Sequence, residues 1–299
     1  MPSPAAVSCA WCGLAFDDGA VHLHQRTRCA SCGAATTDPP PTAEELAEAY
    51  GEWYRPKAER RFYFAADAIL GRTRGILASR IDAAAPPGPV LDVGAGEGSL
   101  VDALRARGRE ATGLERGSVR DDFLEASLPE VQGEYAAIVF WHSLEHLPEA
   151  GDAIRHAARL LKAGGVAVIA VPNTDSFQAD AFGDRWLHLD FPRHLVHLSS
   201  GCLVSGLRKE GFEIERVSFV RSGQILIGWL QGIVGLLPGH PDLYHALRRE
   251  RARGVHQSAP KRWFAIAAGV LVSPIAAVLA GAEITARRAG TVYIEARRP

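Results

Sequence analysis

The stretch Val90-Leu91-Asp92-Val93-Gly94-Ala95-Gly96-Glu97-Gly98-Ser99 decides the fold of this 299-residue chain. Its first four residues have the apolar character of a short strand, and the glycines that follow stand at every second position before a polar helix start. Because glycine has no Cβ, the chain can turn sharply there and a ligand can lie against the backbone. Backbone N–H groups at the start of the next helix then face that ligand. The pattern predicts an open α/β sheet that binds an adenosine-containing cofactor at the carboxyl ends of its strands.

The glycine spacing separates two classes of cofactor. A dinucleotide fingerprint has its third glycine at the sixth position, where this chain has Ser99, and here the third glycine comes one residue early, at Gly98. The G-x-G-x-G spacing, with Asp92 two residues ahead, resembles motif I of class I S-adenosylmethionine (SAM)-dependent methyltransferases. Glu115 ends the next expected strand, where a carboxylate can accept hydrogen bonds from both hydroxyls of a ribose. Its alternative role is that of a solvated carboxylate at a strand end.

The resemblance extends over residues 88–221. Tyr135–His146 looks like the fourth strand and the loop after it, and Leu160–Gly165 looks like the turn before the fifth strand. The segment 172–197 matches a subgroup of these enzymes. Each piece falls in the chain order that the fold demands, so the combination is more specific than any single motif.

Strand and helix patterns alternate from Val90 onward, which predicts a mostly parallel sheet covered on both faces. The resemblance implies a Rossmann-like sheet of seven strands, with the sixth at 212–219 and the seventh, antiparallel at the edge, at 290–297. Residues 90–299 would form the methyltransferase domain. A long apolar helical insertion, 221–289, would separate the last two strands, which should pair.

The resemblance also implies the cofactor contacts. Those expected to hold SAM are Asp92, Gly94, Ala95 and Gly96, with Glu115 on the ribose, Asp122 and Phe123 near the adenine, and Trp141 near the methionine part.

Two departures from the family pattern lie near this pocket. Only five residues separate Glu115 from Asp121, so the helix that usually precedes the third strand is missing or vestigial. Ala136 stands where members often place an aspartate. Both changes leave open a weakened or reshaped SAM site.

Four of the five cysteines form two close pairs, with sixteen residues between the pairs. They are Cys9 and Cys12, then Cys29 and Cys32. Two tight turns that each supply two soft ligands are typical of a tetrahedral zinc site. The alternative is a pair of disulfides in a secreted module, but the N-terminus lacks the basic and apolar regions of a secretory signal. We therefore expect residues 1–37 to form a zinc-ribbon module with a closed, structural Zn²⁺ site.

Residues 38–89 are expected to form a proline-rich linker and leading helices. A helix should begin after Thr42, which is a good N-cap residue, and helical sequence continues to about Ile81. Related enzymes fold this region over the cofactor. Tyr50 and Tyr54 would then either reach SAM or substrate, or pack on the sheet as part of an aromatic stripe.

Histidines follow the fourth and fifth expected strands. Methyl transfer to an oxygen acceptor usually needs a base, and histidine is the commonest one, which makes His142, His188 and His194 the candidate catalytic residues. Glu145 and His146 would act either in the site or as a local cap. The alternative for His188 and His194, which follow the fifth expected strand, is that they belong to a hydrogen-bonded structural loop. A metal site is permitted by several spacings, although no tight set of carboxylates accompanies the histidines in the sequence.

The insertion contains two apolar stretches. Ile225–Leu237 has a single polar residue, and Phe264–Ala282 has no charged residue. A membrane span needs ~20 apolar residues, so the first stretch is too short and the second is borderline. Three alternatives remain open at this point: buried or homodimer-forming helices, a peripheral membrane contact, and a true span. A membrane contact would suggest a lipid-like acceptor.

The net charge of −1 gives no reason to expect a polyanionic partner. Residues 1–89 hold nearly equal numbers of acidic and basic side chains, which weighs against nucleic acid. We predict a SAM-dependent methyltransferase that acts on a small-molecule or lipid-like acceptor, in the cytoplasm and with membrane association as an open alternative. Two other functions compete: a zinc-ribbon RNA methyltransferase, and a non-catalytic binding module that kept the fold.

Overall fold

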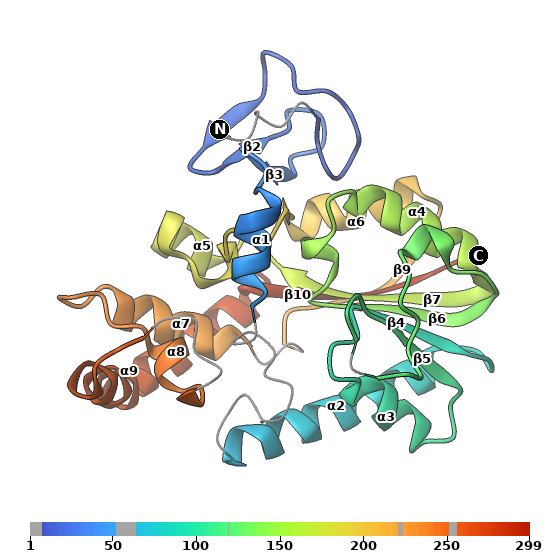
Figure 1. Ribbon diagram of the computed structural model, residues 1–299. Helices are drawn as coiled ribbons and strands as arrows, with labels where there is room; N and C mark the ends of the chain where they lie inside the picture. Colours follow the sequence, from blue (N-terminus) through green and yellow to red (C-terminus); the bar gives the residue numbers. More distant parts are fainter. Residues whose placement is uncertain (1–7, 52–63, 119, 221–223, 251–255) are drawn as a thin grey trace.

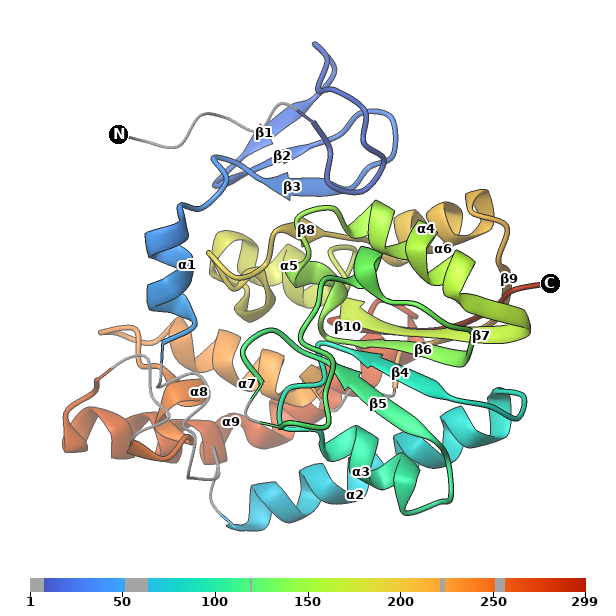
Figure 2. The same cartoon turned by 45° about the vertical axis from the view of Figure 1, so that its right-hand side comes forward.

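The computed structural model describes residues 8–51, 64–118, 120–220, 224–250 and 256–299 (Figure 1). A central six-stranded sheet carries helices on both faces, which confirms the expected Rossmann-like α/β fold. A small antiparallel sheet near the N-terminus lies beyond one of the helical layers, and the helices of the insertion lie to one side of the central sheet (Figures 1 and 2).

The central sheet positions the site. Its strands are β4 (Val90–Val93), β5 (Ala111–Leu114), β6 (Tyr135–Trp141), β7 (Leu161–Pro172), β9 (Glu213–Ser218) and β10 (Thr291–Arg297), in the spatial order β5-β4-β6-β7-β10-β9. The strands β5, β4, β6 and β7 are mutually parallel, and β10 runs antiparallel to both β7 and β9. The expected pairing of the last two strands is therefore confirmed.

Two details of the expected sheet were wrong. The described residues form six strands rather than seven, because the third strand is reduced to a single parallel bridge between Leu114 and Leu124. A parallel neighbour needs a crossover of about a dozen residues or more, and the short segment after Glu115 cannot supply one. The second detail is the position of β10, which lies inside the sheet while β9 forms the edge.

Helices cover both faces of the sheet. One face carries α2 (Phe64–Ala84) and α3 (Ser99–Arg105), and the other carries α4 (Ala150–Leu160) and α6 (Ser200–Lys209) (Figure 1). In α4 the buried side chains recur at Ala150, Ile154 and Ala157, the spacing that places them on one face of a helix.

The leading region is not one continuous helix. A capping box between Thr42 and Glu45 begins α1 (Ala43–Ala49), as the sequence predicts. The helix ends at Ala49, and α2 (Phe64–Ala84) is helical through Ile81, so the expected leading helices are two separate elements on either side of the residues that lie outside the described part of the chain. Tyr54 lies outside the described residues.

The N-terminal module shares a sheet with the rest of the chain. Its strands are β1 (Val21–Leu23), β2 (Arg26–Arg28) and β3 (Ala35–Thr37), and β3 pairs with β8 (Val196–His197), which comes from the loop after β7. Trp11 of this module is buried and lies against α6: a Cβ placed on Gly206 would come within 2.3 Å of the Trp11 ring.

The insertion folds as helices. These are α7 (Gln224–Gly235), α8 (Leu243–Ala246) and α9 (Ala259–Thr285), and they pack on one another and on α5 (Phe177–Phe182). The buried carboxylate of Glu283 ties α9 down, because it accepts hydrogen bonds from the side chains of Gln178 and Trp229 at 2.9 and 3.0 Å. By length and composition α9 is apolar enough to cross a membrane. Only 22% of its most apolar window is buried inside the structure.

Candidate active site

The glycine turn lies where β4 ends. Gly94 has a φ of +76°, and a Cβ at this position would come within 2.5 Å of the Cβ of Ser143 in the loop after β6. Only glycine therefore allows the two loops to touch. The N–H of Gly96 donates to the carboxylate of Glu115 at 2.7 Å, so this carboxylate braces the turn from the end of β5. Ala95 lies between these two glycines, in the same turn.

Asp92 is the buried carboxylate of this turn. Its side chain is 3% exposed, and its Oδ1 has no hydrogen-bond partner among the described residues. Burial raises the pKa of Asp92 to about 7; the positive charge of Arg74 opposes the rise, and the negative charge of Glu115 adds to it. A buried polar atom without a partner is costly, so the turn has an acceptor available for a ligand.

The residues expected near the adenine lie beside the same turn. Phe123 is buried, and a Cβ on Gly98 or on Gly113 would come within 2.6 Å of its ring. The guanidinium of Arg120 stacks on that ring at 4.6 Å. Asp122 is engaged by Arg120, at 2.9 Å, and by Arg105, and these hydrogen bonds hold the pKa of its carboxyl well below the usual range.

Trp141 ends β6 and is partly exposed. The Arg74 guanidinium lies 5.3 Å from its ring centre, and the His142 ring meets it edge to face at 5.6 Å. The strand end thus brings an aromatic surface directly next to the first candidate base.

His142 and Glu145 form a close pair after β6. His142 has a φ of +52°, an uncommon conformation for a residue with a side chain, and its Nδ1 lies 3.3 Å from Oε1 of Glu145. Glu145 belongs to a short helical turn, η2 (Leu144–His146), and is 2% exposed. Burial by itself raises the pKa of Glu145, but the hydrogen bond from His142, together with the other histidines nearby, outweighs this and leaves that pKa lowered to about 2. Nε2 of His142 and Oε2 of Glu145 are buried and have no hydrogen-bond partner among the described residues.

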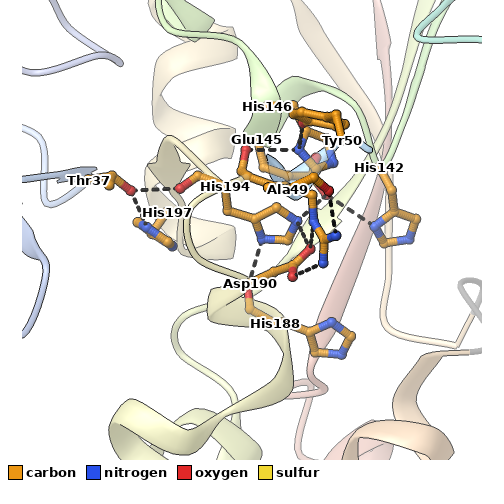
Figure 3. A network of polar contacts seen from close by, with 11 residues as sticks. Thr37, Ala49, Tyr50, His142, Glu145, His146, His188, Asp190, His194 and His197 are labelled. Carbon is orange, nitrogen blue, oxygen red and sulfur yellow. Dashed lines mark hydrogen bonds and ion pairs between the residues drawn. The ribbon is translucent and has the colours of Figure 1, made fainter. Parts of the chain in front are cut away.

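The loop after β7 brings His194 to the same carboxylate (Figure 3). Nε2 of His194 lies 4.0 Å from Glu145 Oε1 and 3.6 Å from Asp190 Oδ2, while its Nδ1 lies 2.8 Å from the backbone carbonyl of His188. Arg193 pairs with Asp190. The backbone N–H of Leu195 donates to the carbonyl of Glu145 at 2.8 Å, which joins the two loops directly.

Three further histidines surround this centre. His146 is linked to the Tyr50 hydroxyl and to the Arg193 carbonyl, each at 3.0 Å, and His197 contacts Thr37 of the N-terminal module at 3.1 Å. His188 packs edge to face on Trp186. Burial lowers the pKa of His146 to about 4 and those of His188 and His197 to about 3, so all three rings are neutral at pH 7.

A family model described as a methyltransferase domain matches residues 58–217, just over half of the chain. The chain belongs to this methyltransferase family. The ubiquinone biosynthesis O-methyltransferase of Marinobacter nauticus is 29% identical over 103 residues, which cover 28% of this chain and 43% of that protein. The protein of the same name from Xanthomonas oryzae pv. oryzae is 28% identical over 153 residues, 43% of this chain and 64% of its own length. The chain spans about half the length of the curated relatives it matches.

Solved structures also resemble this chain. The Burkholderia thailandensis 1,6-didemethyltoxoflavin-N1-methyltransferase, with bound 1,6-didemethyltoxoflavin and S-adenosylhomocysteine, is 16% identical, with a TM-score of 0.47, and the match covers 93% of this chain and 98% of that one. Magnesium protoporphyrin IX methyltransferase from Synechocystis, with bound SAH, is 14% identical, with a TM-score of 0.45, and the match covers 86% and 94% of the two chains.

The four N-terminal cysteines of the chain lie together as free thiols. Each residue offers a sulfur within 4.8 Å of the other three; the sulfurs of Cys9 and Cys32 are 3.6 Å apart, and those of Cys12 and Cys29 are 3.7 Å apart. Zn–S bonds of ≈2.3 Å in a tetrahedral site place the sulfurs ~3.8 Å apart, so these distances fit a zinc ion.

Sequence reasoning missed the central place of Glu145 in this site. From the sequence, Glu145 could be either a local helix cap or a functional residue. No tight set of carboxylates was expected near the histidines. The structure contradicts the second point, since Glu145 and Asp190 both lie within 4.0 Å of His194. One signal was available: Glu145 follows β6 and Asp190 follows β7, and the carboxyl ends of adjacent parallel strands meet at one edge of a sheet.

Proposed function

We propose that this chain is a SAM-dependent methyltransferase that methylates a small-molecule acceptor by in-line displacement. The observation that carries the proposal is the contact between the glycine turn and the histidine loop. Gly94 and Ser143 approach so closely that no side chain fits between them. A cofactor held at the turn would therefore present its methyl group beside His142 and Glu145. Much of the rate of such a transfer comes from holding the acceptor close, aligned and away from water.

The turn fits the cofactor in shape and chemistry. Gly94, Ala95 and Gly96 provide a bare backbone surface, and the unpartnered Oδ1 of Asp92 is an acceptor inside it. When bound, SAM supplies a sulfonium methyl group as the electrophile. We assign Glu115 to the ribose side of this pocket and Trp141 to the methionine side. Phe123 borders the adenine side, and Asp122, which is held by two arginines, contributes to that wall.

His142 is the proposed general base. Glu145 can only accept a hydrogen bond, so the proton of neutral His142 lies on Nδ1, and Nε2 carries the free lone pair. That nitrogen is buried and unpartnered among the described residues, which suits a group that takes a proton from the acceptor. His188 and His194 line the same region, and their rings complete the acceptor side.

The insertion points to an acceptor drawn from a membrane. Phe264, Leu271 and Val278 recur at every seventh residue of α9 and are 51%, 80% and 72% exposed. The opposite side of α9 packs on α7 and α8, and Glu283 is buried at its end, so the helix offers one apolar face. We propose a peripheral contact in which the protein is cytoplasmic and α9 lies along the cytoplasmic surface of the bilayer. Lys261 and Arg262 precede this stripe and suit an anionic surface.

The four cysteines are proposed to bind a structural Zn²⁺ in the module of residues 1–37, with residues 38–89 as linker and leading helices and 90–299 as the catalytic domain. All four ligands come from the protein, so the ion would have no open position for chemistry.

Calorimetry with S-adenosylhomocysteine tests the function. Gly94→Ala should weaken binding by at least about tenfold, because the new Cβ meets Ser143 in addition to the strain of a positive φ. Gly108→Ala is the matched control: this glycine has a φ of +81°, and no atom lies within 4 Å of its added Cβ. Should the unmodified chain release no heat with this ligand, the non-catalytic alternative would hold. RNA binding that falls steeply with salt would favour the RNA enzyme.

A further inference from the structure

We propose that Glu145, His146 and His194 form a second metal site, which takes a divalent transition-metal ion such as Zn²⁺ or Fe²⁺. Each of the three residues offers a ligand atom within 4.8 Å of the other two. Two histidines and one carboxylate form a ligand set that leaves positions open on the ion. The site is separate from the four cysteines, and its nitrogen ligands set it apart from the all-oxygen sites that Mg²⁺ and Ca²⁺ prefer.

Backbone carbonyls fix the tautomer of both histidines. The carbonyl of Arg193 lies 3.0 Å from Nδ1 of His146, and the carbonyl of His188 lies 2.8 Å from Nδ1 of His194. A carbonyl oxygen can only accept, so each Nδ1 carries the proton and each Nε2 keeps its lone pair. Histidine ligands of metal ions are held in this way, with the second nitrogen donating to a carbonyl or a carboxylate.

Glu145 supplies the negative charge and has an oxygen to spare. Its Oε1 contacts His142, whereas its Oε2 is buried and without a hydrogen-bond partner among the described residues. A carboxylate removed from water needs a charged or hydrogen-bonding partner. A cation beside Oε2 would supply that partner and leave Oε1 on His142.

The loops around the cluster hold its members in place. Leu195 N–H bonds to the Glu145 carbonyl, and the rings of His146 and His194 meet edge to face at 4.7 Å (Figure 3). Ligands on one ion lie ~3 Å apart for metal–ligand bonds of 2.0–2.2 Å. His194 Nε2 lies 4.0 Å from Oε1 of Glu145, so a small side-chain rotation would bring this nitrogen and Oε2 of the same carboxylate onto one ion.

The use of this ion in catalysis rests on the proposed function. A divalent ion lowers the pKa of an oxygen that it binds. An acceptor with a hydroxyl at this site would lose its proton to Nε2 of His142 as its oxygen forms a bond to the methyl carbon and the bond between that carbon and sulfur breaks. The ion therefore points to an oxygen acceptor rather than a carbon acceptor.

The test is a titration of the reduced, metal-free full chain with Co²⁺, followed by visible spectroscopy. We expect two ions per chain: one with the intense charge-transfer bands of thiolate ligands and one with the weaker bands of nitrogen and oxygen ligands. Glu145→Gln and His194→Ala should each lose one ion and keep the thiolate bands. Replacing Cys9, Cys12, Cys29 and Cys32 together by serine should lose the thiolate bands and keep the other ion.

His156→Ala is the matched control, because this histidine lies on α4 outside the cluster, and it should keep both ions. A wild-type chain that binds a single ion with a thiolate spectrum would overturn the proposal, and so would a Glu145→Gln chain that still binds two. The number of ions that the wild-type chain binds tests the proposal even if a variant fails to fold. No SAM and no acceptor enter this measurement, so loss of the metal site and loss of the proposed function are seen separately.

Discussion

At the scale of single residues, the proposed site contains polar atoms that the fold buries without a hydrogen-bond partner. Among the described residues, Asp92 and Glu145 are the two carboxylates with such an atom, but their surroundings act in opposite directions. Burial raises the pKa of Asp92, whereas the histidines around Glu145 keep its carboxylate ionised. One carboxylate is therefore sensitive to pH near neutrality, and the other is not.

The pKa of Asp92 predicts how stability depends on pH. Its value of about 7 in the folded chain lies above the usual 3.9 of an unfolded aspartate. Between these values the folded state binds a proton that the unfolded state does not, so the free energy of unfolding should fall as the pH rises from 4 to 7. Urea unfolding at pH 5 and pH 8 should show a fall of up to about 2.6 kcal/mol that Asp92→Asn lacks.

Asp122→Asn is the control for this experiment. Its pKa is lowered by arginine partners, so both of its states are ionised from pH 5 to pH 8 and its substitution should not change the slope. Parallel pH profiles for the wild type and Asp92→Asn would contradict the assignment.

At the scale of elements, the sequence predicted what local pattern determines. The strand and turn at 90–98, the capped helix after Thr42 and the apolar helices of the insertion all follow from periodicity or from glycine chemistry. The short segment after Glu115 signalled the lost helix, but only the structure showed that the third strand shrinks to one bridge. The meeting of Glu145 with His194 depends on how two loops pack, which no local pattern encodes.

The contact between α6 and the N-terminal module gives a prediction at this scale. Alanine is a better helix former than glycine, yet Gly206→Ala should destabilise the chain by about 1–3 kcal/mol, because its Cβ meets the Trp11 ring. Gly201→Ala, on the same helix, has no atom nearer than 3.9 Å and should be neutral or stabilising. Urea unfolding measures both, and equal effects would show that Trp11 does not pack there.

At the scale of the whole molecule, an enclosed polar cluster contrasts with an exposed apolar helix. The histidine cluster is enclosed by loops, whereas α9 leaves large apolar side chains uncovered. Exposed apolar side chains gathered on one face of a helix mark an interaction site. The proposed partner is the surface of a membrane that supplies the acceptor.

Sedimentation with vesicles of phosphatidylcholine and phosphatidylglycerol tests this contact. Leu271→Glu should reduce vesicle binding by at least about tenfold, since burying a leucine is worth about 1.5–3 kcal/mol. Ile76→Glu changes an exposed residue on α2 and should bind as the wild type does. If the wild type ignores vesicles but forms a dimer that Leu271→Glu separates, the apolar face is a subunit contact and the membrane proposal is wrong.

The sheet that β3 forms with β8 has a consequence for anyone who shortens this protein. A version that starts at Asp38 would remove the neighbour of Val196 and His197 and leave their backbone as an open edge. Such an edge invites pairing with other molecules, and the residues next to it hold His194. The amino-terminal segment therefore covers an edge next to the proposed site in addition to holding the proposed zinc ion, and we expect a chain shortened in this way to aggregate.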